Sequence, residues 1–169
     1  MMKQLFLPAL LLLAVSAPAQ TDEQAAIISV IEKLFDGMRT GDSTAVRSVF
    51  VPDAILQTVA TKQNTAPRLL AEDFGKFIEA VGSPRTEVWD ERIWSYDVRI
   101  DGPLATAWTE YTFFLGEKMS HCGVNAFMLF KGESGWKITL IADTRRLVDC
   151  RTETGSRKND ESTPKGRNK

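Results

Sequence analysis

The stretch "GVNAFMLFKGESGWKITLIADTRR", residues 123–146, consists of two extended segments on either side of the polar turn "GESG". Branched and aromatic residues favour strands, and the second segment alternates with period two through Trp136, Ile138 and Leu140. Glycines at both ends of the turn suit a tight connection. We therefore predict an antiparallel hairpin, whose last strand ends in an acid and two arginines.

The extended pattern continues upstream to about residue 87 and defines four segments. They cover about 87–100, 104–115, 120–131 and 136–146, and the turns "DGP", "GEK" and "GESG" separate them. Strands that follow one another through tight turns pair as antiparallel neighbours. We predict a four-stranded antiparallel meander over this part of the chain.

Most of the chain before residue 86 has helical spacing instead. Thr21 and Asp22 can cap a first helix, which Gly41 ends, because apolar residues recur there every three or four positions. These apolar residues are Ile27, Ile28, Ile31, Leu34, Phe35 and Met38. Asp42 can cap a short second helix that ends at Pro52.

A short strand over 53–61 and a third helix over about 67–81 complete this half of the chain. The third helix is predicted from the spacing of Leu69, Leu70, Phe74, Phe77, Ile78 and Val81. Helices followed by a run of strands indicate an α+β fold, in which the helices cover one face of an antiparallel sheet.

Both ends of the chain differ in composition from a folded domain. Lys3 precedes an apolar run over 5–15 and the stretch "SAPAQ", which is the layout of a secretory signal peptide, and we expect cleavage after Ala19. The alternative is an uncleaved anchor, but the run is shorter than the roughly 20 residues that span a bilayer. Residues 151–169 are polar without helical periodicity, and we expect disorder. A single domain over 20–150 remains, in a protein exported to the periplasm or secreted, with no stable membrane span after cleavage.

The charge balance and the cysteines narrow the functional classes. A formal net charge of -1 argues against a nucleic-acid partner, because phosphate binding usually needs a basic surplus. On export Cys122 and Cys150 would enter an oxidising compartment, either joined in a disulfide or as two free thiols. With one histidine in the chain, no metal-binding spacing is present, so we expect no metal and no cofactor.

The order of the elements resembles the nuclear transport factor 2-like superfamily. The resemblance rests on "LFDGMRTGDSTAVRSVF" (34–50), "VPDAIL" (51–56) and the closing stretch 123–146, which is most similar to the exported, SnoaL-like and lumazine-binding-like branch. It implies a cone-shaped, curved antiparallel sheet with about three N-terminal helices packed on its concave face. It implies little about activity, because this fold hosts isomerases, dehydratases, cyclases, transport factors and binding modules.

The strand register predicts which side chains line the cone. A hairpin through Gly132 to Gly135 places Leu129 beside Ile138, and the neighbouring strands follow from it. The inner face then carries Leu104, Thr106, Trp108, Glu110, Thr112, His121, Asn125, Phe127, Leu129, Ile138, Leu140, Ala142, Thr144 and Arg146. The outer face carries Tyr111, Phe113, Val124, Met128, Phe130 and Ile141. So apolar an outer face predicts a homodimer that forms through it.

A single β-bulge in the last strand would change this assignment. It would turn Ile141, Asp143 and Arg145 inward in place of their neighbours. Asp143 and Arg145 share a face in either register, since they stand two positions apart, and an ion pair between them could orient a polar ligand. The alternative is an ordinary ion pair at the solvent-exposed rim.

Four further residues are candidates for ligand binding. His121, the single histidine, could act as an acid, a base or a hydrogen-bond donor, or could be a half-exposed residue at a strand end. Glu110 and Asn125 are expected side by side, where a shielded carboxyl could move protons or merely satisfy the amide. Trp108 could stack on a flat ligand or pack in the core.

The resemblance allows one check of activity. Steroid isomerases of this superfamily carry a general-base aspartate in the first strand, and the matching position here is Thr58. They also use a tyrosine of the first helix, which has none in this chain. Isomerase activity of that type is therefore not expected.

We predict a dimeric, exported protein that binds a small, partly apolar molecule. One alternative is a dehydratase-, isomerase- or cyclase-like enzyme, in which His121 acts with Glu110 or Asp143 to transfer protons. The other is a protein-interaction module that uses the apolar outer face.

Overall fold

The computed structural model describes residues 18–61 and 65–151, with side chains from Thr21 onward. The segment up to residue 17, which holds most of the predicted signal peptide, and the polar tail from residue 152 lie outside these residues. The described helices are α1 (Pro18–Thr40), α2 (Ser43–Ser48) and α3 (Phe74–Gly82). The described strands are β1 (Phe50–Ala60), β2 (Arg68–Glu72), β3 (Trp89–Ile93), β4 (Asp97–Asp101), β5 (Leu104–Leu115), β6 (Lys118–Gly132) and β7 (Gly135–Arg145).

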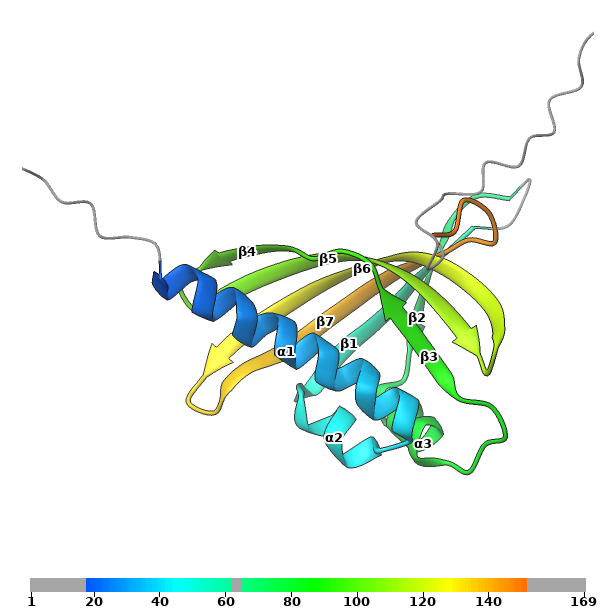
Figure 1. Ribbon diagram of the computed structural model, residues 1–169, viewed down its shortest axis with the longest axis horizontal. Helices are drawn as coiled ribbons and strands as arrows, with labels where there is room; N and C mark the ends of the chain where they lie inside the picture. The colour runs from blue at the N-terminus through cyan, green and yellow to red at the C-terminus, as the bar shows by residue number, and fades with distance from the viewer. Residues whose placement is uncertain (1–17, 62–64, 152–169) are drawn as a thin grey trace, which may run out of the picture.

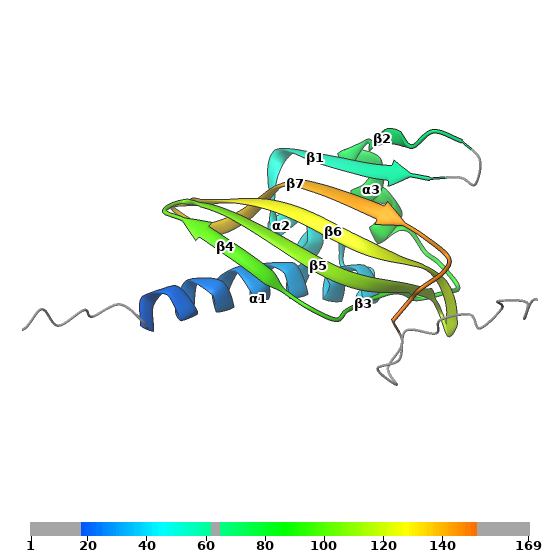
Figure 2. The same cartoon turned by 90° about the horizontal axis from the view of Figure 1, so that it is seen from above.

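The described strands form one curved sheet with the order β2-β1-β7-β6-β5-β3, and β4 also pairs with β5. Neighbouring strands are antiparallel except β1 and β7, which are parallel. The three helices lie along the concave side of the sheet, and α1 crosses it lengthwise (Figures 1 and 2). The predicted α+β class and the cover of helices on one face are confirmed, with a mixed, mostly antiparallel sheet.

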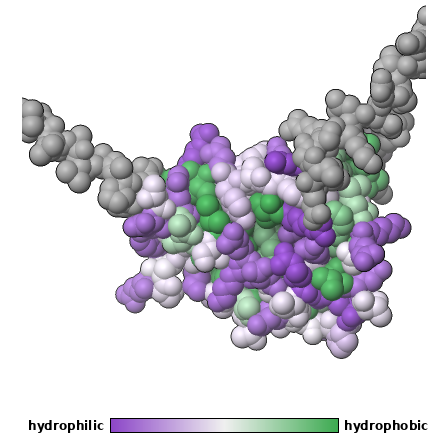
Figure 3. Space-filling model, viewed as in Figure 1, coloured by the Kyte–Doolittle hydropathy of each residue, from purple (hydrophilic) through white to green (hydrophobic). Residues whose placement is uncertain are grey.

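Helix α1 buries the apolar stripe that its spacing predicts. Ile27 and Ile31 are fully buried in the core, together with Leu129 of β6. The rings of Phe35 and Phe127 meet edge to face, with centroids 6.3 Å apart. On the side of the molecule that carries α1, the surface is mostly hydrophilic, with scattered apolar residues (Figure 3). The core therefore lies between α1 and the concave face of the sheet.

The helix starts agree only in part with the predicted caps. Asp42 caps α2 as predicted, because its carboxylate accepts a hydrogen bond of 2.8 Å from the backbone of Ala45. Helix α1, however, begins at Pro18, a residue suited to the first helical turn, so Thr21 and Asp22 lie inside the helix instead of capping it.

The predicted helix over 67–81 is in fact two elements. Leu69 and Leu70 lie in β2, which pairs with β1 and is exposed along its length. Asp73 then caps α3 by accepting a hydrogen bond of 2.8 Å from the backbone of Lys76. The adjacent leucines fit either kind of element, so their spacing did not reveal the boundary.

The predicted strand over 87–100 is also divided. It forms β3 and β4, which both pair with β5, and three residues over 94–96 face two residues of β5. The backbone of Trp94 still donates a hydrogen bond of 2.9 Å to the carbonyl of Glu110. The extra residue is a bulge, which bends the sheet at this point.

A second bulge sets the inner face of the last strand. The final hairpin starts in the predicted register, but Thr139 is an extra residue between Ile138 and Leu140. Beyond it the side chains change faces, and Asp143 and Arg145 turn toward the helices. The register with the bulge is therefore correct, and the register without it is wrong.

A third bulge, at Ser120 in β6, sets the register between β5 and β6. Glu110 pairs with Val124 instead of lying beside Asn125, so the two faces of β5 are the reverse of the predicted ones. The inner residues of β5 are Ala105, Ala107, Thr109, Tyr111 and Phe113. Trp108 is 54% exposed on the outer face.

Candidate functional site

A cavity of about 660 Å³ lies between the concave face of the sheet and helices α1 and α3. Much of its wall is apolar. The apolar lining residues include Leu34, Phe35, Met38, Phe77, Trp89 and Ile141. Polar side chains gather on the part of the wall that β1, β3, β6 and β7 form. Glu72, Asp73 and Lys76 add charged side chains from β2 and the start of α3, so the cavity has an apolar surface, a polar cluster on the sheet and charged groups beside α3.

Asp143 is at the centre of this polar cluster. The parallel pairing of β1 with β7 places Thr58 directly beside it, and the Thr58 hydroxyl donates to its carboxylate at 2.5 Å. Tyr111 donates to the same carboxylate at 3.2 Å, and Arg145 donates through Nε at 2.8 Å. The side chain of Asp143 is only 12% exposed. These donors hold an acceptor of hydrogen bonds in the cavity wall.

Arg145 extends the cluster toward the edge of the sheet. Its Nη2 donates to Glu72 of β2 at 3.3 Å, while Nε remains on Asp143. The ion pairs with Asp143 and Glu72 keep the pKa of Arg145 raised despite its partial burial, which acts to lower it. The side chain of Arg145 is 45% exposed, so it can contact a ligand or water.

Glu91 is a second carboxyl in the cavity. It lies on β3 between Trp89 and Ile93, and Asn125 donates a hydrogen bond of 2.7 Å to it. Removal from bulk water raises the pKa of Glu91 to about 8, and the nearby charge of Asp143 acts in the same direction. Asn125 and Arg145 act to lower it. At neutral pH this carboxyl is therefore mostly protonated.

His121 lines the cavity near the start of β6. Its Nδ1 lies 3.0 Å from the hydroxyl of Ser120, and its ring packs edge to face on Tyr111 with centroids 5.8 Å apart. Burial, and the charge of Arg145, lower the pKa of His121 below its ordinary value. Burial also raises the pKa of Tyr111. Both rings are therefore uncharged at neutral pH.

The structure brings together four of the predicted site residues. His121, Asn125, Asp143 and Arg145 all line the cavity. Two others, Trp108 and Glu110, do not, because the register of β5 turns them to the outer face. Placing them in the pocket was wrong, since a shift of one residue reverses every side chain of a strand.

Three features of the site were not among the residues predicted from the sequence: Glu91, Tyr111 and the contact of Thr58 with Asp143. A signal for Glu91 was present, because Trp89 and Ile93 stand two positions before and after it and all three share a face. Tyr111 was assigned to the wrong face of β5. The neighbour of Thr58 could not be found locally, since the two residues are 85 positions apart in the chain.

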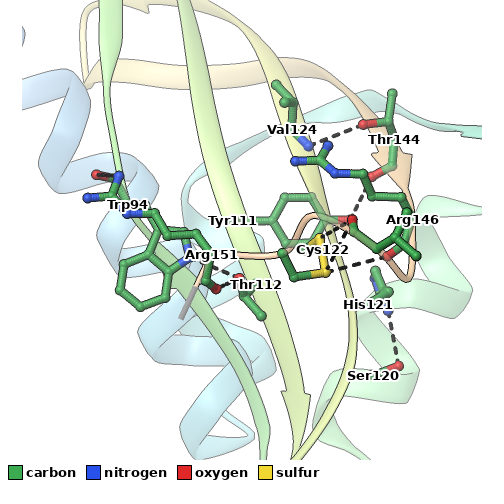
Figure 4. The surroundings of a disulfide bond; sticks show 12 residues. Trp94, Tyr111, Thr112, Ser120, His121, Cys122, Val124, Thr144, Arg146 and Arg151 are labelled. Atoms are coloured by element: carbon green, nitrogen blue, oxygen red, sulfur yellow. Dashed lines mark hydrogen bonds between the residues drawn. A yellow bond between two sulfur atoms is a disulfide. The ribbon is translucent and has the colours of Figure 1, made fainter. Parts of the chain in front are cut away.

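Cys122 and Cys150 are joined by a disulfide. It holds the segment after β7 against β6 on the outer side of the sheet (Figure 4). The carbonyl of Arg151 accepts a hydrogen bond of 2.6 Å from Thr112, and its guanidinium packs over the ring of Trp94. The disulfide adjoins His121 in sequence but lies on the other face.

No group of three or more histidine, cysteine or acidic side chains that could hold a metal ion occurs within 18–61 and 65–151. None of the helices in the part of the chain that the structure describes is long and apolar enough to span a bilayer.

A model of the family described as "Putative lumazine-binding" matches residues 22–140. None of the curated proteins matches this chain. An NTF2-like protein of unknown function from Shewanella baltica has a similar structure, with a TM-score of 0.58, 17% identity, and coverage of 78% of this chain and 99% of that chain.

Two further solved structures are similar. A protein of unknown function from Mycobacterium tuberculosis has a TM-score of 0.65 and 15% identity, over 80% of this chain and 79% of that chain. A protein described as a "putative dehydratase" of the NTF2-like family, from Streptomyces avermitilis, has a TM-score of 0.60 and 15% identity. The match covers 77% of this chain and 100% of that chain. At these identities the similarity shows the fold alone.

Proposed function

We propose, on the premise that this chain belongs to the family described as "Putative lumazine-binding" within the NTF2-like superfamily, that it binds a small, partly apolar molecule in its cavity. The observation that carries the proposal is the cavity itself. Its volume of about 660 Å³ lies within the range of small-molecule sites, roughly 300 to 1,000 Å³. An apolar wall with a few converging polar groups is the usual composition of such sites.

The chemistry of the cavity supports a flat, mostly uncharged ligand. Trp89 and Phe77 offer apolar surface, while the polar groups gather around Asp143 and Glu91. The family description points to a lumazine-type heterocycle, which fits this combination. The proposal, however, rests on the cavity and extends to other partly apolar molecules.

A second candidate function is proton transfer, which the raised pKa of Glu91 favours. A carboxyl with a pKa near the working pH can both give and take a proton, and Asp143 lies in the same cavity with a different set of partners. In this candidate Glu91 takes the place of Glu110, so that His121 acts with Glu91 or with Asp143. It remains in the dehydratase, isomerase or cyclase class.

Export is part of the proposal. The disulfide between Cys122 and Cys150 supports it, because disulfides persist in the periplasm or outside the cell and are rare in the cytosol. The layout of the N-terminal segment supports it independently.

A homodimer through the outer face of the sheet is also part of the proposal. Four large apolar side chains are 42% to 54% exposed on β5 and β6, and they lie on one face: Leu104, Trp108, Met128 and Phe130. Apolar side chains that gather on one exposed face often mark a protein–protein contact. Light scattering should give the mass of a dimer, and Met128→Lys should give a monomer. A monomeric wild-type protein would refute this part.

Native mass spectrometry of the protein purified from its own compartment tests the binding function. A small molecule released on denaturation is the expected result, and its mass identifies its class. Ala80→Trp places a large ring in the cavity and should abolish the bound mass, whereas Glu79→Trp, on the exposed side of the same helix, should keep it. Equal retention by both variants would show that the molecule binds elsewhere. Turnover of the released compound, lost in Glu91→Gln, would favour the enzyme.

A further inference from the structure

We propose that Glu91 is a hydrogen-bond donor to the ligand, and that the ligand therefore carries an uncharged acceptor, such as a ring carbonyl, on an otherwise apolar frame. This inference rests on the proposed binding function and specifies the chemistry of its ligand. It concerns a residue for which the sequence patterns gave no role.

Glu91 lies in the wall of the cavity. The strand β3 directs it into the cavity between two apolar neighbours, Trp89 and Ile93, so its surroundings on that strand are not those of a surface carboxyl. Among the described residues, Asn125 is the one that donates to Glu91, and it occupies Oε1 at 2.7 Å. The second carboxyl oxygen is left for the contents of the cavity.

The charged and donor groups near Glu91 do not compensate for its burial, so its protonated form is favoured. The positive charge of Arg145 acts to lower the pKa of Glu91. However, the Nε of Arg145 donates to Asp143 and its Nη2 donates to Glu72. Thr58 and Tyr111 also donate to Asp143. All three of these side chains therefore donate to Asp143 and none donates to Glu91. An ionised Glu91 would add a poorly compensated negative charge to the same wall of the cavity. Glu91 keeps its proton, in agreement with its pKa of about 8.

A protonated carboxyl has one O–H group to donate. The hydroxyl of Tyr111 is already shared between Asp143 and the carbonyl of Thr144. The apolar side chains of α1 that close the cavity offer no acceptor. A ligand with a carbonyl oxygen can accept a hydrogen bond from the O–H of Glu91, and a hydrocarbon of the same shape cannot.

The test compares 1-tetralone with tetralin, which has the same ring system without the oxygen. Each is titrated into uniformly ¹⁵N-labelled protein, and shifts of cavity amides such as those of Leu34 and Ile141 give its dissociation constant. The measured quantity is the ratio of the tetralin constant to the tetralone constant. We expect Glu91→Leu to lower this ratio about tenfold, through loss of one hydrogen bond.

A pH series adds a second, independent measurement. Between pH 7 and 9.5 the wild-type ratio should fall about tenfold, because Glu91 loses its proton as the pH rises through about 8. Glu91→Gln keeps an uncharged donor and should hold the ratio constant over this range. The other titratable or charged groups around the cavity are Glu72, Asp73, Lys76, Tyr111, His121, Asp143 and Arg145. Any effect that they have remains in Glu91→Gln, which makes this variant the matched control.

The possible results distinguish failure of the donor role of Glu91 from failure of the proposed binding function. Equal ratios in the wild type and Glu91→Leu, or the same pH dependence in the wild type and Glu91→Gln, would overturn the inference and leave the binding function standing. If neither probe shifts the cavity amides at millimolar concentration, the inference falls and the binding function loses its support. The pH series on the wild type decides the question even if Glu91→Leu does not fold.

Discussion

Asn125 and Glu91 are joined by a hydrogen bond of 2.7 Å that passes over β5, the strand between their own strands. The bond therefore links β6 to β3 across the inner face of the sheet and fixes a carboxyl in the cavity. It stabilises the ionised form of Glu91, so it acts against the burial that raises the pKa of Glu91.

Replacing Asn125 with leucine should raise the pKa of Glu91 above its value of about 8. A hydrogen bond to a charged group contributes about 1.5 to 3 kcal/mol, so the increase should be roughly one to two pH units. The carboxyl carbon of Glu91, followed by NMR through a pH titration, gives the value directly. An unchanged or lower pKa would mean that the bond does not form in solution.

The stability of the wild-type protein should fall between pH 6.5 and 8 relative to Glu91→Gln. Folding raises the pKa of Glu91 from 4.5 to about 8, so in this range the folded protein holds a proton that the unfolded chain has released. The free energy of unfolding therefore decreases as pH rises, by at most about 1.4 kcal/mol per pH unit, and levels off above about 8.

Urea denaturation at several pH values, followed by tryptophan fluorescence, measures this difference. His121 titrates in both proteins, and its lowered pKa makes stability rise with pH through about 6.5, so subtraction of the variant curve removes its effect. Parallel curves for the two proteins would contradict the protonated state of Glu91.

Thr58→Val should destabilise the protein by about 1 to 2 kcal/mol. The substitution keeps the shape and branching of the side chain but removes the donor to Asp143, and Thr58 is only 5% exposed. Thr106→Val, on the outer face of β5, is the matched control and should change stability by less than about 0.5 kcal/mol. Equal effects of the two substitutions would show that the contact with Asp143 contributes nothing.

Reduction of the disulfide between Cys122 and Cys150 should cost about 3 to 4 kcal/mol, because the bond closes a segment of 28 residues. The double variant Cys122→Ala, Cys150→Ala should be as stable as the reduced wild type and should not respond to a reductant. Chemical denaturation with and without the reductant provides the comparison. A wild-type protein that does not respond would indicate two free thiols in solution.

The elements that local chemistry determines could be predicted. Helix α1 follows from its apolar spacing, the start of α2 from the cap of Asp42, and the bounds of β5 from the turns on either side. The last hairpin begins in the predicted register because Gly135, with φ of 91°, suits its tight turn. In each case the deciding residues lie within a few positions of one another.

The inner wall of the cavity could be predicted only in part, because single extra residues decide it. The bulge at Ser120 reverses the faces of β5 and the bulge at Thr139 reverses those of the end of β7, and neither residue has a side chain that requires a bulge. The one at Ser120 placed Glu110 outside the cavity, and the one at Thr139 placed Asp143 within it. Their positions follow from how the sheet closes on the helices, which depends on the whole fold.

The parallel pairing of β1 with β7 also has a consequence for synthesis of the chain. Thr58 and Asp143 are 85 residues apart, so at about 5 to 20 residues per second β7 leaves the ribosome roughly 4 to 17 s after β1. Until then β1 has only the short β2 as a partner in the sheet. The polar wall of the cavity is thus among the last parts of the molecule that can form. A chain that stops before β7 would leave the β1–β2 pair detached from the rest of the sheet and open to association with other unfinished chains.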